Sequence, residues 1–158
     1  MQELFPGLKD NTRRFEVNYD EGLKVGYKWY DAEGKEPLFA FGFGLSYTSY
    51  AYSDLKVTGS LPEAVSFTVK NTGDRAGAEV AEVYVTLPAA AGEPFKRLVA
   101  WEKVPLAAGE SKTVSLTLDP HYLSIYSDKG EWQLVGGEYK IQVGGSSRGP
   151  LLTQTFKN

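Results

Sequence analysis

The sequence contains no cysteine, one histidine and no long apolar run. A chain without thiols forms neither a disulfide scaffold nor a cysteine-ligated zinc site. The single histidine, His121, follows Asp119 and Pro120 in a predicted loop. There it is expected to be a capping or surface residue, because one histidine supplies neither a histidine metal cluster nor a catalytic triad with a serine motif. These absences predict no metal site and no cofactor.

The charge balance is mildly acidic, with 17 basic and 20 acidic residues, a net charge of −3 and a pI near 5.3. Nucleic acids and anionic membranes are bound through concentrated basic surfaces, and the basic residues here are scattered. Residues 1–15 lack the apolar core and cleavage site of a signal peptide, and no segment approaches the roughly 20 apolar residues that cross a bilayer. We expect a soluble protein with no nucleic-acid partner and no membrane partner.

Aromatic residues are abundant, at 13% of the sequence, and from about residue 49 most apolar residues alternate with polar ones. The alternation of residues 111–118 is typical of a half-buried strand. Turn signals such as Asn71-Thr72-Gly73 and Gly136-Gly137 separate successive strands. About seven or eight strands in roughly 110 residues match the size of an immunoglobulin-like sandwich. We therefore predict an all-β, immunoglobulin-like β-sandwich over residues 49–158.

Two tryptophans, Trp101 and Trp132, lie inside alternating segments, so we expect both in the core of this sandwich. The apolar phase slips near Trp101, which predicts a β-bulge there.

Residues 1–48 are predicted to form an aromatic-rich β arm. In residues 23–30 the apolar side chains fall at every second position, which predicts a strand with one buried face. This strand has no obvious partner in the chain. We expect the first 15 or so residues to be mobile.

The segment Pro37 to Val57 joins the arm to the sandwich. Its first half places large apolar residues around Gly42 and Gly44, and glycine permits positive φ and close backbone approach. These two glycines therefore predict a bent, fixed connector rather than regular structure.

This segment, PLFAFGFGLSYTSYAYSDLKV, resembles the connector of glycoside hydrolase family 3 enzymes, the β-glucosidases and their relatives. Two further motifs resemble the same family. Upstream, Tyr19-Asp20-Glu21-Gly22 precedes the segment Val25 to Asp31. Downstream, Asn71-Thr72-Gly73 precedes Gly77, Glu79, Val80 and Tyr84. The resemblance implies the end of an α/β-sandwich domain over residues 1–48 and a fibronectin type III-like domain over residues 49–158.

The resemblance also implies a role without catalysis. Retaining glycosidases need two carboxylates about 5–5.5 Å apart, and the family's nucleophile and acid/base motifs are absent here. No catalytic residue is therefore assigned. The expected partners are the catalytic domains of such an enzyme, which the chain would dock on and stabilise, and the family implies a periplasmic or secreted location for the parent enzyme. The expected contact residues are Tyr27, Trp29, Phe39, Phe41 and Phe43.

Two alternatives remain open at this point. The chain is an independent carbohydrate- or polymer-binding module if tryptophan and tyrosine rings are exposed on one strand face. It is instead a self-associating interaction domain, such as a homodimer formed through the arm, if the strand at residues 23–30 pairs with another edge.

Overall fold

The computed structural model describes residues 18–59, 61–93 and 95–158. The chain divides into two compact units, Met1–Pro37 and Leu38–Asn158, each of which is described by itself. The prediction that the first 15 or so residues are mobile falls outside the described residues.

The described part of the first unit contains a short helix, α1 (Tyr27–Ala32), in place of the predicted strand. Gly26 precedes the helix with a left-handed φ of 60°, and its carbonyl accepts a hydrogen bond from the Trp29 amide at 3.0 Å. At the other end, the Glu33 amide donates to the Trp29 carbonyl at 2.9 Å. The prediction of a strand at residues 23–30 is therefore wrong, because these backbone groups bond locally rather than to a neighbouring strand.

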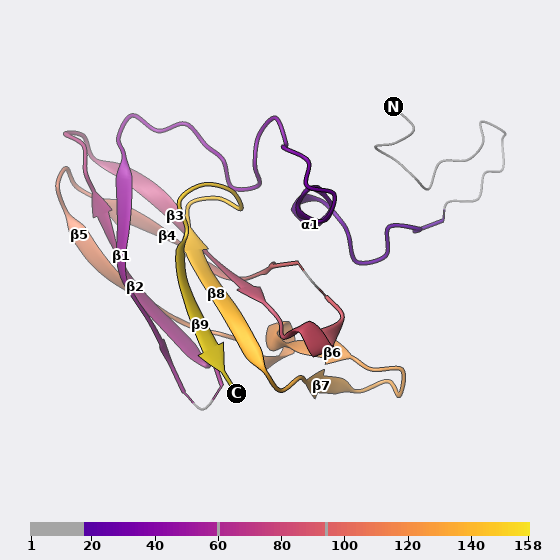
Figure 1. The fold of residues 1–158 in the computed structure, drawn as a ribbon. Helices are drawn as coiled ribbons and strands as arrows, with labels where there is room; N and C mark the ends of the chain where they lie inside the picture. Colours follow the sequence, from indigo (N-terminus) through magenta and orange to yellow (C-terminus); the bar gives the residue numbers. More distant parts are fainter. Residues whose placement is uncertain (1–17, 60, 94) are drawn as a thin grey trace, which may run out of the picture. The chain divides into compact units, whose positions relative to one another are not determined.

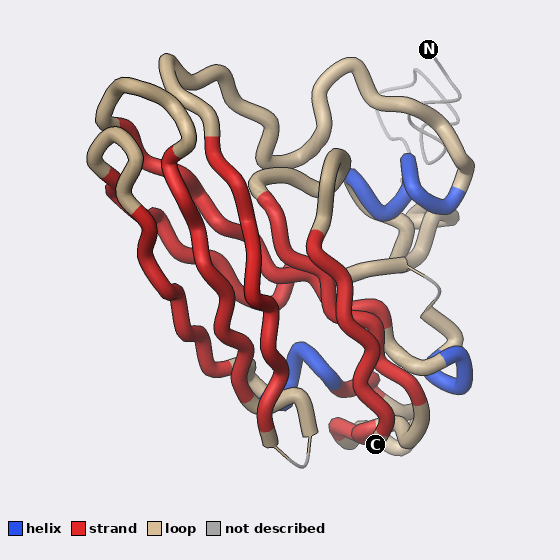
Figure 2. Tube along the Cα trace, turned by 60° about the vertical axis from the view of Figure 1, so that its left-hand side comes forward, coloured by secondary structure: helices blue, strands red, loops and turns tan. Residues whose placement is uncertain are grey.

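The second unit contains two facing antiparallel sheets (Figures 1 and 2). The first sheet has the order β1-β2-β5, and the second has the order β4-β3-β8-β9. The strands of the first sheet are β1 (Tyr50–Thr58), β2 (Ala64–Asn71) and β5 (Ser111–Thr117). Those of the second are β3 (Gly77–Thr86), β4 (Arg97–Leu106), β8 (Glu138–Gly144) and β9 (Leu152–Lys157). The prediction of an all-β sandwich is confirmed.

Short elements lie in the connections between these strands. A 3₁₀ turn, η2 (Ala89–Ala91), follows β3, and a second, η3 (Pro120–Leu123), follows β5. The chain then forms a small separate hairpin of β6 (Ser124–Tyr126) and β7 (Trp132–Leu134). Among the helices of the described residues, none has the length and apolar character needed to cross a membrane.

Two strands contain irregularities, one of which the apolar pattern had indicated. In β4 the register with β3 shifts next to Val99, close to the predicted bulge at Trp101. In β1 the register with β2 shifts between Ser53 and Lys56, where Asp54 has a φ of 56°. A bulge inserts one residue and thereby moves the following side chains to the other face of the strand.

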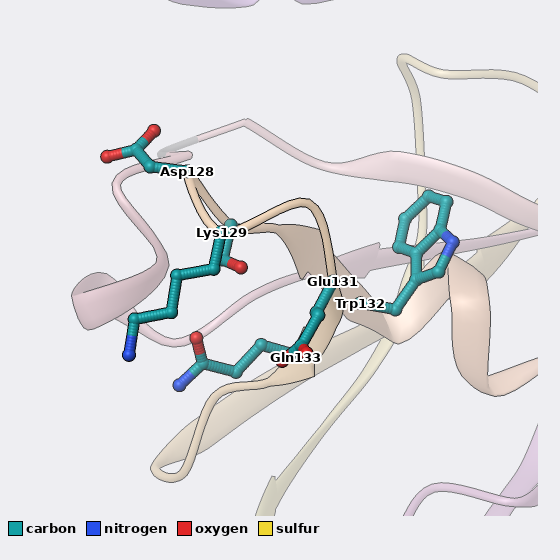
Figure 3. Close-up of a pocket in the computed structure, with 6 residues that line it drawn as sticks. Asp128, Lys129, Glu131, Trp132 and Gln133 are labelled. Carbon is teal, nitrogen blue, oxygen red and sulfur yellow. The ribbon is translucent and has the colours of Figure 1, made fainter.

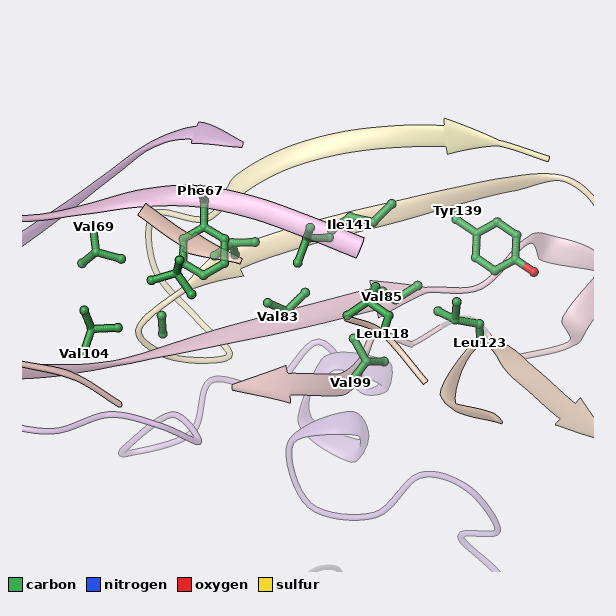
Figure 4. Packing of buried hydrophobic residues seen from close by; sticks show 14 of the residues in the cluster. Phe67, Val69, Val83, Val85, Val99, Val104, Leu118, Leu123, Tyr139 and Ile141 are labelled. Atoms are coloured by element: carbon green, nitrogen blue, oxygen red, sulfur yellow. The ribbon is translucent and has the colours of Figure 1, made fainter. Parts of the chain in front are cut away.

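The hydrophobic core lies between the two sheets (Figure 4). Phe67 of β2, Val83 of β3 and Ile141 of β8 are fully buried there. Each alternates with residues that point away from the core, as the period of two requires. Burying one such side chain contributes about 1.5–3 kcal/mol. The inner face of the second sheet therefore forms part of the core, and its outer face points away from the core.

Candidate functional site

The connector, residues 38–48, is held against the outer face of the β4-β3-β8-β9 sheet. The Ser147 amide donates a hydrogen bond to the Phe41 carbonyl at 2.8 Å. Gly42 lies directly over Glu82 of β3, so that a Cβ on Gly42 would be 2.5 Å from Oε2 of that carboxyl group. Because Ala81 and Val83 face the core, Glu82 between them faces outward. The connector thus closes over a glutamate on the outer face of the sheet.

Glu82 is a buried acid, with only 5% of its surface exposed. The Tyr84 hydroxyl donates to its Oε2 at 2.6 Å. Burial raises the pKa of the Glu82 carboxyl above its ordinary value, and the hydrogen bond from Tyr84 only partly opposes this change. The outer face beneath the connector therefore favours a protonated carboxyl group.

A buried asparagine, Asn71, fixes the end of the connector. Its Oδ1 accepts hydrogen bonds from the Thr48 hydroxyl at 2.5 Å and from the Gly73 amide at 3.1 Å. Its Nδ2 donates to the carbonyls of Arg75 at 2.7 Å and Leu106 at 3.3 Å. One fully buried side chain thereby joins the connector, the turn after β2 and the end of β4.

Small residues and a second acid pack around the start of β1. The Tyr52 hydroxyl donates to Oε1 of Glu79 at 2.8 Å, and a Cβ on Gly145 would collide with the same oxygen. A Cβ on Gly77 would likewise collide with the hydroxyl of Tyr50. Burial raises the pKa of both the Glu79 carboxyl and the Tyr52 hydroxyl. The glycines therefore leave room for the side chains that pack between β1 and the second sheet.

The rings of the connector are exposed although its backbone is fixed. Phe39 is 67% exposed, Phe41 50% and Phe43 52%. The rings of Phe39 and Phe43 stack with their centroids 5.3 Å apart, across a turn in which the Phe43 amide donates to the Ala40 carbonyl at 3.0 Å. Leu38, Leu45 and Tyr47 are also exposed. The connector therefore presents apolar side chains on a backbone that the sandwich holds in place.

The two predicted connector glycines differ in their surroundings. Gly42 has a positive φ of 81° and the close contact with Glu82. Gly44 has no positive φ, and a Cβ added to it would meet no atom within 4 Å. Only Gly42 has a conformation and a neighbour that require glycine.

The remaining predicted contact residues, Tyr27 and Trp29, lie in α1 of the first unit and are partly buried. The Trp29 ring makes an edge-to-face contact with Tyr30 and has the Lys35 ammonium 4.9 Å from its centroid. Their role in contacting a partner stays a prediction.

The expectation that Trp101 and Trp132 belong to the core is wrong, since their exposed fractions are 63% and 55%. Trp101 follows the bulge at Val99, and the slip that keeps Val99 in the core turns Trp101 to the outer face of the sheet. Trp132 lies in β7, whose three residues are all exposed. The alternation had been assigned to the wrong face at Trp101, whereas neither face of β7 at Trp132 is buried.

The β6–β7 hairpin carries a cluster of exposed rings. Tyr126 and Trp132 are cross-strand partners, and the Trp132 ring makes edge-to-face contacts with Tyr126 and His121 at 5.3 Å between centroids. The same hairpin has a shallow polar hollow, and in Figure 3 the side chains of Lys129 and Gln133 point to the opposite side from the Trp132 ring. Polar groups and exposed rings are thus on different sides of the hairpin.

Among the described residues, no group of three or more histidine, aspartate or glutamate side chains is arranged to hold a metal ion.

The sequence and the fold match known proteins. Residues 79–147 match the family model described as "Fibronectin type III-like domain". The chain is 41% identical to a thermostable β-glucosidase B from Acetivibrio thermocellus over 160 residues, a match that covers 97% of the chain and 20% of the relative. The structure resembles that of DesR, a β-glucosidase from Streptomyces venezuelae, with a TM-score of 0.86, 37% identity and coverage of 96% of the chain and 20% of DesR. It also resembles a GH3 β-glucosidase from Bifidobacterium adolescentis, with a TM-score of 0.81, 37% identity, and coverage of 90% of the chain and 22% of that protein.

The chain is similar in sequence and fold to the C-terminal, fibronectin type III-like part of family 3 β-glucosidases. It spans about a fifth of the length of these relatives. The resemblance noted in the sequence is therefore confirmed.

The structure gives the family-like motif a physical meaning that the sequence did not supply. Asn71, Gly77 and Glu79 all surround the segment where the connector enters the fibronectin type III-like domain. Sequence analysis missed Glu82 and Thr48 as parts of this arrangement. Glu82 could have been found from the sequence because it is a charged residue inside the apolar run of residues 80–87. A glutamate that is buried in such a strand needs a hydrogen-bond partner nearby.

Proposed function

We propose that the chain docks on the catalytic domains of a family 3 glycosidase through the connector and stabilises them. The observation that carries this proposal is the combination of an exposed ring cluster with a fixed backbone. Phe39 and Phe43 are more than half exposed, yet the connector between them is held by Ser147 and closes over Glu82. A folded domain that fixes a segment with exposed apolar rings is suited to contact another folded surface.

The lengths of the relatives support the same partner. The chain spans about a fifth of the A. thermocellus and S. venezuelae β-glucosidases, at their C-terminal end. The rest of such an enzyme precedes the connector in sequence. A surface next to the connector is therefore close to the covalent neighbour, which raises the effective concentration of that neighbour.

A chimera tests this function. The chain replaces the matching segment of the A. thermocellus β-glucosidase, and the half-life of glucosidase activity at elevated temperature is compared with that of the relative lacking the segment. We expect the glucosidase activity of the chimera to have the longer half-life. Phe39→Ala should shorten the half-life, because completing the burial of an exposed ring contributes about 1–3 kcal/mol.

The matched control is Tyr126→Ala, which removes an equally exposed ring from the distant β6–β7 hairpin. It should leave the half-life of the chimera unchanged. A chimera no more stable than the shortened relative, or equal effects of both substitutions, would contradict docking through the connector.

A second candidate function, binding of a carbohydrate, is supported by the exposed pair Tyr126 and Trp132 on one face of the hairpin. Sugar rings stack on such aromatic faces. Titration of the chain with a soluble β-glucan should then change tryptophan fluorescence, and Trp132→Ala should abolish the change while Trp101→Ala leaves it. An unchanged spectrum at saturating glucan excludes this function. Self-association through residues 23–30 has lost its basis, since these residues form no strand.

A further inference from the structure

The outer face of the second sheet continues the exposed surface of the connector. Glu82 of β3 and Trp101 of β4 are paired directly across the two strands. Directly opposed residues of an antiparallel pair point to the same face, with Cβ atoms about 4.5–5.5 Å apart. Since Gly42 of the connector lies on Glu82, Trp101 lies beside the connector.

Trp101 is largely exposed on this face of the described sandwich. Its exposed fraction of 63% is the larger of the two tryptophans in the sandwich unit, and β4 is the edge strand of its sheet. Val80, two residues before Glu82 on the same face, is also exposed and pairs with Lys103 of β4. The face therefore combines exposed apolar side chains with a charged residue beside them, a mixture that is also found at protein interfaces.

We propose that Trp101, Val80 and the connector rings form one docking surface, in which Trp101 is the principal anchor. This inference rests on the proposed docking function and names where that contact extends on the sandwich. The occupant is the part of a family 3 glycosidase that precedes the connector, because the chain enters the sandwich at this same face and covers only about 20% of such relatives. Tryptophan is enriched among residues that dominate binding energy at the centre of interfaces.

The chain provides a matched pair of variants for the test. Trp101→Ala and Trp132→Ala each remove one exposed indole, from β4 and from the β6–β7 hairpin. Both variants of the isolated chain should unfold at the same denaturant concentration as the parent chain, because neither ring is in the core. Any difference in association then arises at the surface.

Binding is measured by titrating the full chain into the A. thermocellus β-glucosidase shortened by the segment that matches it. Trp101→Ala should weaken binding at least tenfold, Trp101→Phe should recover part of the loss, and Trp132→Ala should stay within twofold of the parent chain. If the shortened relative does not fold, the same substitutions are compared in the chimera by the rate of thermal inactivation.

The outcomes separate the two proposals. If the parent chain does not bind the shortened relative, and the chimera is no more stable than the shortened relative, the docking function and this inference are both overturned. A parent chain that binds, with equal affinities for Trp101→Ala and Trp132→Ala, leaves docking intact and overturns the role of Trp101. Loss of binding with Trp132→Ala alone would place the contact on the hairpin and also overturn it.

Discussion

Replacing Gly42 with alanine should release the connector from the sheet. The φ of 81° at this position is left-handed, and a Cβ there would be 2.5 and 2.6 Å from the two carboxylate oxygens of Glu82. The alanine variant must therefore either move the buried Glu82 side chain or lift the connector. Either movement breaks the arrangement in which the Tyr84 hydroxyl donates to Glu82.

The expected cost follows from three contributions. A left-handed backbone costs about 1–2 kcal/mol in a residue with a Cβ. A buried hydrogen bond left unmade between Tyr84 and Glu82 costs about 1–3 kcal/mol. Alanine also restricts the unfolded chain, which returns about 0.4–1 kcal/mol. The free energy of holding the connector in place should fall by about 2–3 kcal/mol.

Hydrogen exchange at the Ser147 amide measures this release directly, because that amide donates to the Phe41 carbonyl next to Gly42. A loss of about 2–3 kcal/mol should accelerate its exchange roughly 30- to 150-fold. Gly44→Ala is the control within the same segment, since Gly44 has no positive φ and no neighbour in contact range. Equal exchange rates in the two variants would refute the role assigned to Gly42.

Three further predictions concern the sandwich itself. Asn71→Ala removes four hydrogen bonds from a fully buried position. It should lower the free energy of unfolding, measured in urea, by about 2–4 kcal/mol. The control, Asn158→Ala at the exposed terminus, should have no effect. Phe67→Ala should cost about 3–5 kcal/mol in the same assay, because it opens a cavity between the sheets; a loss below 1 kcal/mol would contradict the packing. The raised pKa of Glu82 means that folding favours its protonated form, so the stability this group contributes is full below the ordinary glutamate pKa and is lost as pH rises through the raised value. In Glu82→Gln the melting temperature should therefore fall less steeply as pH rises than it does in the parent chain. An equal slope in both proteins would contradict the raised pKa of Glu82.

Much of the sandwich was predictable because its strands have one buried and one exposed face. The alternation in residues 111–118 and 139–143 requires a period of two, and the core follows from it. The bulge in β4 was also visible as a slip in phase, whereas the one in β1 was not predicted. The sequence did not show which face follows a slip, and Trp101 was assigned to the core for that reason.

The error at residues 23–30 has a different cause. Apolar residues at positions 23, 25, 27 and 29 fit a strand, but Tyr27 and Tyr30 are also spaced for one face of a helical turn. A strand needs a neighbour to satisfy its backbone groups, and the described residues of the first unit contain none. The chain therefore forms hydrogen bonds within its own sequence, as the contact from Trp29 to Gly26 shows.

The candidate site was predictable only in its exposed rings. Phe39 and Phe43 were named as contact residues because the family resemblance implies neighbouring domains for them, and the structure finds both rings exposed. The groups that fix them, Asn71 and Glu82, are polar residues whose importance comes from burial. Burial of a polar group depends on which distant segment covers it, and this is decided by the tertiary structure.

The fixed connector has a consequence for the kinetics of assembly. A flexible segment loses conformational entropy when it binds, and that loss weakens association. Here the Ser147, Glu82 and Asn71 contacts order the connector when the sandwich folds, so a partner meets a preorganised surface. Association should then be limited by diffusion and by the orientation that two rigid surfaces need for docking, without a coupled folding step. The sandwich would thereby act as a template that sets the geometry of its own attachment before the partner arrives.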